Sequence, residues 1–546
     1  MKWRIGLLVF LFGSLYAVLT FNLYNLQIKH GLIFATQAAD QNRQSGLSIP
    51  NRGNIYFVDK DNRQIPAVLN KEFSIIYAVP TEIADSLETA SQISAIVGQS
   101  VNALKEALSK PKSQYELLVY KASDDQIKQI QDLKVKGIYI TKELLRFYPL
   151  GERASQVLGF VGPNQNDDGI TGRYGIEAYF NDLLGGQTGQ IQGDFIIKPK
   201  NGDDLVLTID PNIQLEAEDI LKNLVEEYKA SAGMVIVEEP KTGKILAMNS
   251  VPSFDPNNYS NYSLSSFLNP VVQAVYEPGS VFKVLTMSAG IDSGKITPQT
   301  TYVDKGSVTY NGKTIQNFEL KTYGKQTMTN VIENSINTGA VFAERQTGHE
   351  TFYNYLKNFG LNVATGITLP GELKGNLSNL VNGKDINYAT ASFGQGVAVT
   401  PIEVINAIAA IANKGKLMKP YIVASEKPTV IRQVISENTA NQVVQMMVSA
   451  VKVNKVADIK NYSVAAKTGT AFVPNFKTGG YTEDVINTYI GFAPAYDPRF
   501  IILFRIDKPA GAISAGRSVV PAFKKLAEFL LNYYNVAPDQ LDNANH

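Results

Sequence analysis

The sequence of 546 residues contains no cysteine and only three histidines. The absence of cysteine excludes disulfides, zinc–cysteine sites, iron–sulfur clusters and thiol nucleophiles. The histidines are His30, His349 and His546, so a Ser-His-Asp hydrolase would have to use His349, and a three-histidine metal site would have to draw in residues near both chain ends. If the protein is a nucleophilic enzyme, its base is therefore expected to be a lysine or a carboxylate.

The sequence also lacks bulk charge, because 51 basic residues are balanced by 50 acidic ones. Without a net positive field, nucleic-acid binding would have to rest on a local basic patch, and the sequence shows none. The other proportions are ordinary for folded domains, with 44% hydrophobic and 18% charged residues. At roughly 100–200 residues per domain, the length predicts two or more domains.

Charge is missing completely from Ile5 to Ile28, a run that follows Lys2 and Arg4 and ends before Lys29. About 20 apolar residues suffice to cross a bilayer, so this run predicts a transmembrane helix. The alternative is a cleaved signal peptide, whose apolar core is usually about 7–15 residues long and ends at a small-residue cleavage site that this run does not clearly show. The positive-inside rule then predicts a single-pass type II protein of the plasma membrane, with a cytoplasmic N-terminus and an extracytoplasmic catalytic part.

The rest of the sequence predicts two modules of different pattern. Short strand-like runs and one helical stretch indicate an α+β module over residues 29–205; the strands are expected at 55–58, 73–79 and 115–120 and the helix at 93–108. The second module, over residues 206–535, alternates helices and apolar strands; we expect a helix after residue 210, a hairpin over 233–248, a buried helix that begins at Thr400, strands at 488–493 and 500–506, and a terminal helix over 521–534. Residues 536–546 are expected to form a frayed tail.

Ser280 and Lys283 are the first candidates for chemistry. They follow the turn-forming sequence Glu277-Pro278-Gly279 and precede an apolar run, so both are expected on one face near the start of a helix. Free backbone N–H groups and the helix dipole would stabilise negative charge on an attacked carbonyl there. Lys283 can act as the base only if its pKa falls well below the free value of about 10.4, which requires burial or a second cation.

Lys467 can supply that second cation. It opens the sequence Lys467-Thr468-Gly469-Thr470 at the end of an apolar run, which predicts an exposed strand edge. Gly469 would let a substrate backbone approach, and the threonine hydroxyls would donate hydrogen bonds while the ammonium faces a carboxylate. This sequence is therefore a candidate binding edge for a peptide-like substrate.

Ser335 and Asn337 lie between these two motifs. The serine hydroxyl can relay a proton, and the asparagine amide can bind both Lys283 and a substrate carbonyl. Each motif alone is weak evidence, because each occurs again in the sequence. Ser-x-x-Lys recurs at Ser109, Lys-Thr-Gly at Lys241 and Lys477, and Ser-x-Asn at Ser436. For any single copy, a solvated turn or helix face is the simpler interpretation. The order is more specific, since Ser335 follows Ser280 by 55 residues (335 − 280) and Lys467 follows Ser335 by 132 (467 − 335).

These motifs in this order are those of serine β-lactamases and penicillin-binding proteins. The chain as a whole resembles a class B penicillin-binding protein, the membrane-anchored D,D-transpeptidase of bacterial cell-wall synthesis. Supporting stretches recur in the family's order along both modules: Asn51-Arg52-Gly53-Asn54-Ile55, Tyr174-Gly175-Ile176-Glu177, Leu207-Thr208-Ile209-Asp210, Thr242-Gly243-Lys244-Ile245, Pro252-Ser253-Phe254-Asp255 and Phe393-Gly394-Gln395-Gly396. One departure is Ile336, where related sequences often have a smaller or polar residue, which suggests that the backbone matters at that position.

The resemblance implies the fold. It predicts an α+β pedestal similar to the dimerisation domain of penicillin-binding proteins, followed by a transpeptidase domain like that of penicillin-binding proteins and serine β-lactamases. That second domain is expected to be α/β, with a central antiparallel sheet flanked by helices. The N-terminal run over residues 1–28 would then anchor both domains to the membrane.

The resemblance also implies the acylation step. Ser280 would attack the carbonyl between the two terminal D-alanines of a peptidoglycan stem peptide while Lys283 removes the serine proton. The backbone N–H groups of Ser280 and Thr470 would form the oxyanion hole. No metal and no organic cofactor would be required.

The other motif residues would complete the reaction. Ser335 and Lys467 would relay the proton to the departing D-alanine, while Thr468 and Thr470 hold the substrate carboxylate beside Lys467. Asn337 would position the acyl chain. An amine from a neighbouring stem peptide would then displace the serine.

Sequences at 277–279 and 506–509 look more like the septal, cell-division branch of the family than the elongation branch. The implied partners are peptidoglycan stem peptides and nascent glycan strands, β-lactam inhibitors, the membrane, a partner glycosyltransferase and other membrane proteins of the division complex, and no nucleic acid.

Two alternatives remain open. A D,D-carboxypeptidase or β-lactam-hydrolysing relative would use the same groups but let water deacylate the enzyme, and a non-catalytic division scaffold would dispense with the Ser-Lys pair.

Overall fold

The computed structural model describes residues 3, 12–16, 19, 50–164, 169–192, 195–455, 457–475, 477–511 and 514–540. Apart from residues 12–16 and 19, the predicted anchor over residues 5–28 lies outside the described residues, and none of the described helices has the length and apolar character that a membrane crossing needs. The chain divides into two compact units. One comprises residues 1–53 and 182–204 and contains the two-stranded sheet of β7 (Gln190–Gln192) and β8 (Phe195–Ile197).

The larger unit comprises residues 54–181 and 205–546. Its first module, residues 54–181, is α+β as predicted. The sheet has the order β3-β2-β1-β9 with β4 beside β2; the strands are β1 (Ile55–Val58), β2 (Gln64–Ala78), β3 (Glu116–Val119), β4 (Ile138–Phe147) and β9 (Leu205–Val206). Three helices bury their apolar sides with residues of β2, β3 and β4; they are α3 (Ser86–Val97), α4 (Val101–Leu108) and α5 (Asp124–Leu133). The short elements that follow are α6 (Ser155–Leu158), β5 (Val161–Pro163), β6 (Ile170–Gly172) and α7 (Gly175–Tyr179). The next helix, α8 (Asn181–Gly185), belongs to the other unit from residue 182 onward.

The single helix predicted over residues 93–108 is two helices in the structure. Gly98 ends α3 in the left-handed conformation, with φ +70°, which a helix interior does not allow. The next helix is started by Ser100, whose hydroxyl accepts a hydrogen bond from the N–H of Ala103. The pattern of apolar positions is continuous across the two helices, so it did not reveal the helix break at Gly98 and Ser100.

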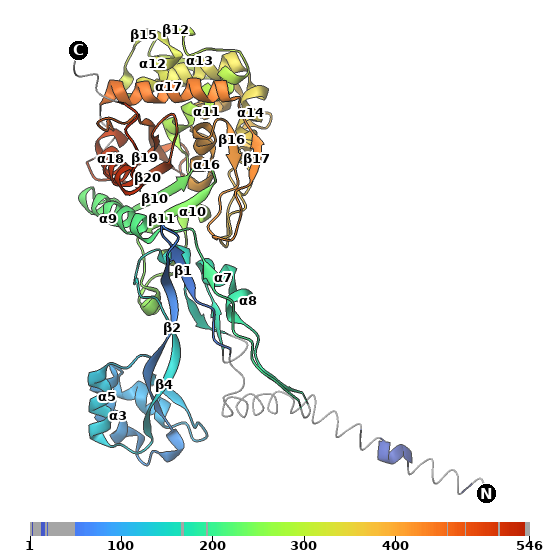
Figure 1. The fold of residues 1–546 in the computed structure, drawn as a ribbon, viewed down its shortest axis with the longest axis vertical. Coiled ribbons are helices and arrows are strands. Elements are labelled where there is room, and N and C mark those ends of the chain that lie inside the picture. The colour runs from blue at the N-terminus through green and yellow to red at the C-terminus, as the bar shows by residue number, and fades with distance from the viewer. Residues whose placement is uncertain are drawn as a thin grey trace. The chain divides into compact units, whose positions relative to one another are not determined.

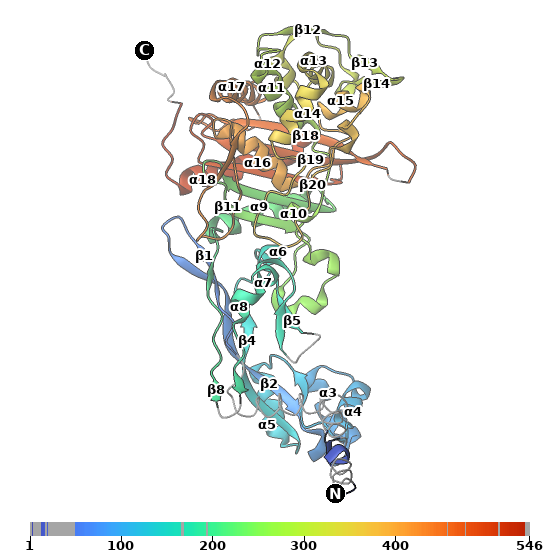
Figure 2. The same ribbon diagram turned by 90° about the vertical axis from the view of Figure 1, so that its right-hand side faces the viewer.

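The second module, residues 205–540, is built on an antiparallel five-stranded sheet in the order β11-β10-β20-β19-β18, which confirms the predicted central sheet. Its strands are β10 (Ala232–Glu239), β11 (Lys244–Val251), β18 (Ala465–Pro474), β19 (Tyr481–Ala493) and β20 (Phe500–Asp507). Helices α9 (Pro211–Glu227) and α18 (Ala515–Tyr533) share one apolar core with this sheet, and α16 (Pro401–Ala412) packs on its other side (Figures 1 and 2). Because β18 is the last strand of this order, it is an edge strand, as predicted.

A group of helices lies beyond the β18 edge of the sheet (Figure 2). It consists of α11 (Lys283–Asp292), α12 (Met328–Glu333), α13 (Asn337–Thr347), α14 (His349–Asn358), α15 (Asp385–Ala391) and α17 (Glu437–Asn454). Small hairpins accompany these helices: β12 (Thr301–Asp304) pairs with β15 (Gly324–Thr327), β13 (Ser307–Tyr310) with β14 (Lys313–Gln316), and β16 (Lys416–Met418) with β17 (Val430–Gln433). A short helix, α10 (Pro270–Gln273), lies near β11. The active-site motifs fall where this helical group meets the edge strand.

The predicted start of the buried helix is confirmed in detail. The Thr400 hydroxyl accepts from the N–H of Glu403, and the Glu403 carboxylate accepts from the N–H of Thr400 at 2.7 Å. Pro401 occupies the first helical position, where its missing N–H costs nothing. All twelve residues of α16 are buried, as expected for a helix whose only charged residue is Glu403.

The terminal helix begins at Ala515, six residues before the predicted start at Pro521. A proline inside a helix removes the hydrogen bond to the carbonyl four residues earlier, which here belongs to Arg517. The hydroxyl of Tyr228 donates to that carbonyl at 2.9 Å and takes the place of the missing N–H. The tail also differs from the expectation, because Asp539 accepts from the N–H of Ser463 at 2.7 Å, so residues up to Gln540 are docked rather than frayed.

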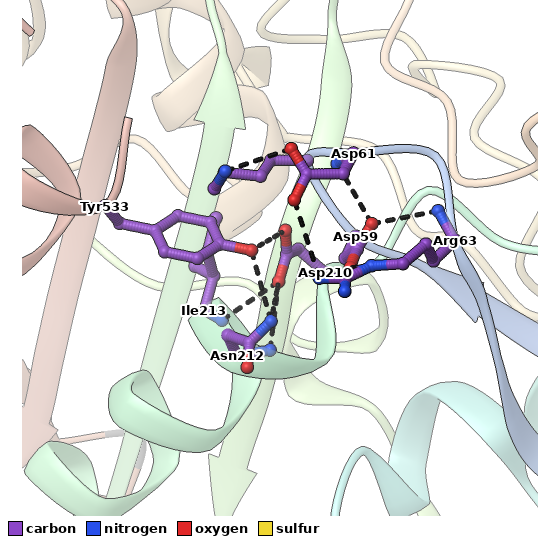
Figure 3. A network of polar contacts seen from close by, with 8 residues as sticks. Asp59, Asp61, Arg63, Asp210, Asn212, Ile213 and Tyr533 are labelled. Atoms are coloured by element: carbon purple, nitrogen blue, oxygen red, sulfur yellow. Dashed lines mark hydrogen bonds and ion pairs between the residues drawn. The ribbon is translucent and has the colours of Figure 1, made fainter. Parts of the chain in front are cut away.

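Several polar contacts and an aromatic cluster around Phe160 join the two modules of the larger unit. Two of the polar contacts involve α9. In the first, the turn between β1 and β2 lies against the ends of α9 and α18 (Figure 3). Asp210 caps α9, Tyr533 donates to its carboxylate at 2.9 Å, and the Lys60 amine lies 5.6 Å from the Tyr533 ring centre. In the second, the buried Glu218 carboxylate of α9 accepts from the N–H of Ala154 at 2.7 Å.

Candidate active site

Ser280 lies in a single turn of 3-10 helix, Gly279–Phe282, that leads directly into α11. Side chains three apart eclipse one another in such a turn, which brings the hydroxyl of Ser280 to 2.9 Å from the amine of Lys283. Gly279 has φ +60°, and its N–H donates to the carbonyl of Gly394 at 3.0 Å. A Cβ atom on Gly394 would lie 2.2 Å from the Gly279 carbonyl oxygen, so glycine is required where the two segments meet.

Lys283 is fully buried, and its Nζ atom has four oxygen neighbours. Besides the Ser280 hydroxyl, it lies 2.5 Å from the carbonyl oxygen of Ser335, 3.2 Å from the Ser335 hydroxyl and 2.8 Å from Oδ1 of Asn337. Burial, and next the charge of Lys467, lower the pKa of Lys283 well below its usual value. A neutral amine in this position can accept the proton of Ser280.

Ser335 is held in the left-handed conformation, with φ +55°, which is uncommon for a residue other than glycine. The turn is fixed by the hydrogen bond from the N–H of Ile336 to the carbonyl of Val331 at 3.0 Å. It directs the hydroxyl of Ser335 between the two lysines, 3.2 Å from Lys283 and 2.9 Å from Lys467. The side chain of Ile336 is buried, which fits the expectation that its backbone is what the site uses.

Lys467 lies on the edge strand β18 and is also buried, with 3% of its surface exposed. Its amine contacts the carbonyl and hydroxyl oxygens of Thr468 at 3.1 and 3.3 Å. Burial lowers the pKa of Lys467 to about 7, so the group is near its midpoint at neutral pH. The two amines are thus connected through one serine hydroxyl.

Gly469 and Thr470 continue the strand past Lys467. A Cβ atom on Gly469 would lie 2.9 Å from the carbonyl oxygen of Pro278, so the absence of a side chain lets β18 pack against the nucleophile turn. The Thr470 hydroxyl accepts from the N–H of Ala515 at 3.2 Å, which ties it to the first residue of α18. Both residues lie at the edge where we expected a substrate backbone.

The structure therefore brings together the five residues predicted to be catalytic: Ser280, Lys283, Ser335, Asn337 and Lys467. Thr468, Gly469 and Thr470 lie beside them on the same strand. The other copies of the motifs have local structural positions: Ser109 is the C-cap of α4, Ser436 is the N-cap of α17, and the sequences at 241–243 and 477–479 lie in the β10–β11 and β18–β19 turns. Their simpler interpretation holds.

Sequence reasoning missed the role of Glu277. One of its carboxylate oxygens accepts from the N–H of Gly396 and the other from the hydroxyl of Tyr481, both at 3.0 Å. Burial raises the pKa of Glu277. The residue fastens the loop at Gly396 and the start of β19 to the turn that carries Ser280, and only its place before the nucleophile hinted at this.

Among the described residues, no histidine lies at the site. His349 lies in a different network, where its ring nitrogens contact Glu344 at 2.6 Å and Asp385 at 2.9 Å and its ring stacks on Tyr388. In the described part of the chain, no three His, Cys, Asp or Glu side chains converge as metal ligands would. The chemistry that this arrangement supports is nucleophilic attack by serine with lysine as the base.

Comparison with known proteins decides the family. Residues 233–528 match the penicillin-binding protein transpeptidase domain, and residues 48–195 match the penicillin-binding protein dimerisation domain. The chain belongs to the penicillin-binding protein transpeptidases. The order of the two domains confirms the resemblance to class B penicillin-binding proteins, and the serine transpeptidase class of enzyme comes with the family.

Similar proteins match this penicillin-binding protein over most of its length. Stage V sporulation protein D of Bacillus subtilis (strain 168) is 32% identical, over 94% of this chain and 83% of its own length. Peptidoglycan D,D-transpeptidase FtsI of Escherichia coli (strain K12) is 30% identical, over 87% of this chain and 83% of its own. The crystal structure of penicillin-binding protein 3 from Mycobacterium tuberculosis, complexed with aztreonam, has a TM-score of 0.70 at 26% identity and covers 91% of this chain and 99% of that one.

Proposed function

We propose that this chain is a membrane-anchored peptidoglycan D,D-transpeptidase that cross-links stem peptides through an acyl-serine intermediate in septal cell-wall synthesis. The observation that carries the proposal is the 2.9 Å contact between the hydroxyl of Ser280 and the amine of the fully buried Lys283. The names of similar proteins, a peptidoglycan D,D-transpeptidase and a sporulation protein, support the reaction and a role in division-related wall synthesis.

Acylation follows from the site. Lys283 takes the proton of Ser280 as the oxygen bonds to the carbonyl carbon between two D-alanines, and the backbone N–H groups of Ser280 and Thr470 stabilise the oxyanion. The carbon–nitrogen bond then breaks. The proton reaches the leaving D-alanine through the hydroxyl of Ser335, which contacts both Lys283 and Lys467.

The strand β18 holds the donor peptide. Thr468 and Thr470 bind its terminal carboxylate beside Lys467, and Asn337, whose Oδ1 already faces Lys283, positions the acyl chain with its amide. In the second half of the reaction, the amine of a neighbouring stem attacks the acyl carbon and the bond from that carbon to the Ser280 oxygen breaks. The proton that the amine loses returns to the Ser280 oxygen through Lys283. Thus one amide bond is exchanged for another.

Hydrolysis by water, as in a D,D-carboxypeptidase or a β-lactam-hydrolysing enzyme, is the second candidate. It needs a base that activates water at the acyl-enzyme. The carboxylate nearest to the nucleophile in sequence, Glu277, already accepts hydrogen bonds on both oxygens. This favours transfer to an amine. A non-catalytic scaffold is disfavoured because the serine and both lysines are in hydrogen-bond contact.

The proposed location is the plasma membrane, with a single type II anchor over residues 5–28 and the catalytic domain on the extracytoplasmic side. The uncharged run and the preceding Lys2 and Arg4 support this orientation. Protease added to spheroplasts should digest the chain beyond about residue 30. Protection of the transpeptidase domain from that protease would contradict the proposal.

The reaction is tested by intact-protein mass spectrometry after exposure to a labelled penicillin. We expect one adduct, mapped to Ser280, and no adduct in Ser280→Ala. Ser109→Ala, which alters the other Ser-x-x-Lys copy, should be labelled normally. An adduct on another residue, or one that persists in Ser280→Ala, would exclude Ser280 as the nucleophile.

A further inference from the structure

The helix that begins with the active-site residue Asn337 has no cap of its own. The N-cap position of α13 is Ile336, whose side chain cannot accept a hydrogen bond. The first N–H groups of a helix have no partner within the helix and need one from outside. Here the N–H of Thr338 donates to Oδ1 of Asn317, a residue from the segment after β14.

Asn317 is in turn held by Asp304, the last residue of β12. Its amide nitrogen lies 3.1 and 2.9 Å from the two carboxylate oxygens of Asp304. The same carboxylate accepts from the hydroxyl of Thr338 at 2.6 Å and from the N–H groups of Gly306 at 3.0 Å and Tyr323 at 2.7 Å. Asp304 and Asn317 are 2% and 3% exposed, so these contacts are shielded from water.

A negative charge on Asp304 is favourable next to the start of α13. Burial opposes ionisation, but the hydrogen bonds, led by that from Thr338, outweigh it and lower the pKa of Asp304. A carboxylate beside the first turn of a helix interacts favourably with the partial positive charge there. Asp304 therefore serves as a remote cap of α13 through Thr338 and Asn317.

The same segment fixes the Asn337 side chain. The amide nitrogen of Asn337 donates to the carbonyl of Gln316, the neighbour of Asn317, at 2.9 Å. This leaves Oδ1 of Asn337 facing the amine of Lys283 at 2.8 Å. One chain segment thus holds both the start of the helix and the orientation of the amide.

We propose that Asp304 and Asn317 are positioning residues of the active site, which hold Asn337 against Lys283 by capping α13 from outside. The inference rests on the proposed function, since it concerns the acylation step. It assigns a role in the reaction to the segment over residues 301–327, which lies outside the three sequence motifs. Displacing Asn337 removes an acceptor that favours the charged form of Lys283, so it changes the protonation of the base as well as its position.

The test uses two variants that disturb the hydrogen bonds of Asp304 and one that does not. Asp304→Asn removes the charge, and Thr338→Val removes the hydroxyl that donates to Asp304 while keeping the side-chain volume. Thr314→Val is the matched control, because its hydroxyl contacts only Thr309 on the exposed β13–β14 hairpin at 2.9 Å in the described contacts. For each protein, the second-order rate of acylation by a fluorescent penicillin is measured as a function of pH, together with thermal unfolding.

We expect Asp304→Asn and Thr338→Val to be acylated about tenfold more slowly or worse, since small displacements of catalytic groups have effects of that order. The acid limb of the pH profile should move to lower pH, because Lys283 loses an acceptor that raises its pKa. Thr314→Val should match the wild type. A purely structural role would lower the melting temperature of the variants and leave rate and pH profile unchanged in the folded protein.

Wild-type rates and pH profiles in both variants would overturn the inference. If Asp304→Asn does not fold, Thr338→Val decides alone. Failure of the proposed function gives a different result, since the wild-type protein itself would then form no adduct at Ser280.

Discussion

At the scale of single residues, the site uses a lysine as the base in place of a histidine. Lys283 and Lys467 are both buried and share the hydroxyl of Ser335. Removing an ammonium from water disfavours its charge, and a second ammonium nearby disfavours it further. The pKa of Lys467 is about 7 and that of Lys283 is lowered by burial and by Lys467, so a neutral amine is available at neutral pH.

This coupling predicts the behaviour of Lys467→Met. Without the neighbouring cation, the pKa of Lys283 should rise, because one of the two causes of its depression is gone. The rate of acylation depends on the neutral form of Lys283, so its acid limb should move to higher pH by about one unit. The pH profile of acylation by a labelled penicillin measures this shift.

Lys477→Met is the matched control for that experiment. It changes the lysine of another Lys-Thr-Gly copy, which lies in the exposed β18–β19 turn. Its profile should coincide with that of the wild type. An acid limb that stays in place in Lys467→Met would show that the charge of Lys467 does not act on Lys283.

The site residues that the sequence could predict are those with a motif. Ser280 and Lys283 were expected to be in contact because residues three apart on a helix share a face, and their side chains are 2.9 Å apart. The left-handed conformation of Ser335 has no sequence signature, since glycine or asparagine would be the usual marker. The partnership of Asp304 with Asn317 and Thr338 was equally hidden, because it joins separate turns through single hydrogen bonds that no periodicity records.

At the scale of secondary structure, prediction worked at several local signals, although the local break at Gly98 and Ser100 between α3 and α4 was missed. The capping sequence at Thr400 gave the start of α16, and the turn at residues 240–243 gave the β10–β11 hairpin. It failed where a distant partner replaced a local one. The start of α18 was hidden because Tyr228, far away in sequence, bonds the carbonyl that Pro521 leaves free.

Strand β10 carries a buried acid that no pattern marks. Glu238 is fully buried, and in the described part of the chain neither of its carboxylate oxygens has a hydrogen-bond partner. Burial raises the pKa of Glu238 to about 8, so the side chain is neutral in the folded protein at neutral pH. The unfolded chain ionises the same group near its ordinary pKa of about 4.3.

The consequence is a pH-dependent loss of stability. Between those two pKa values, the unfolded state releases the Glu238 proton while the folded state keeps it, so stability falls as pH rises, by roughly 1.4 kcal/mol per pH unit from this group. Glu238→Gln should remove that slope. Its free energy of unfolding relative to the wild type should therefore increase by about 2–3 kcal/mol between pH 5.5 and pH 7.5.

Urea unfolding at those two pH values measures the difference. The control is Glu239→Gln, the next residue on the same strand, which contacts Arg499 at 3.3 Å instead of lying in the core. It should leave the wild-type slope largely in place. A Glu238→Gln protein with the same pH dependence as the wild type would contradict the prediction.

At the scale of the whole molecule, both aromatic and polar contacts join the first and second modules of the larger unit. The aromatic ones centre on Phe160 of the first module, whose ring packs against Phe254, Tyr259 and Phe267 of the second. Two of the polar contacts involve α9. On one side, Tyr533 and Asp210 lie against the β1–β2 turn (Figure 3). On the other, Glu218 accepts from the N–H of Ala154 and from the guanidinium of Arg153 at 3.1 Å. Buried polar contacts fix orientation because each group loses its partner when the joint shifts.

Glu218→Ala should loosen this joint. It leaves the N–H of Ala154 without its buried acceptor and removes one of the two acceptors of the Gln214 amide, at a cost of roughly 2–4 kcal/mol. Asp219→Ala, which removes an exposed partner of the same arginine, should cost less than about 1 kcal/mol. In calorimetry of Glu218→Ala, the first module should melt in a separate transition at lower temperature. A single unshifted transition would show that other contacts hold the modules together.

The uncharged run over residues 5–28 is expected to be more than a tether. The uncharged run carries small residues at Gly6, Gly13, Ser14, Ala17 and Thr20, and such residues permit close helix packing in lipid, where burying apolar area gives no drive. We expect this segment to contact another membrane protein of the division complex in addition to holding the enzyme at the membrane.

Two experiments separate the parts of that expectation. Depletion of the protein should produce filaments with blocked septa, whereas rounded cells that still divide would assign it to elongation. Replacement of residues 5–28 by an unrelated membrane helix keeps the enzyme at the membrane and, if the segment is an interface, should abolish septal localisation and complementation. The swap leaves Ser280 and Lys283 untouched, so penicillin labelling of the chimera serves as the control. Normal localisation and growth with the foreign helix would reduce the segment to a tether, because only a specific packing surface distinguishes the two sequences.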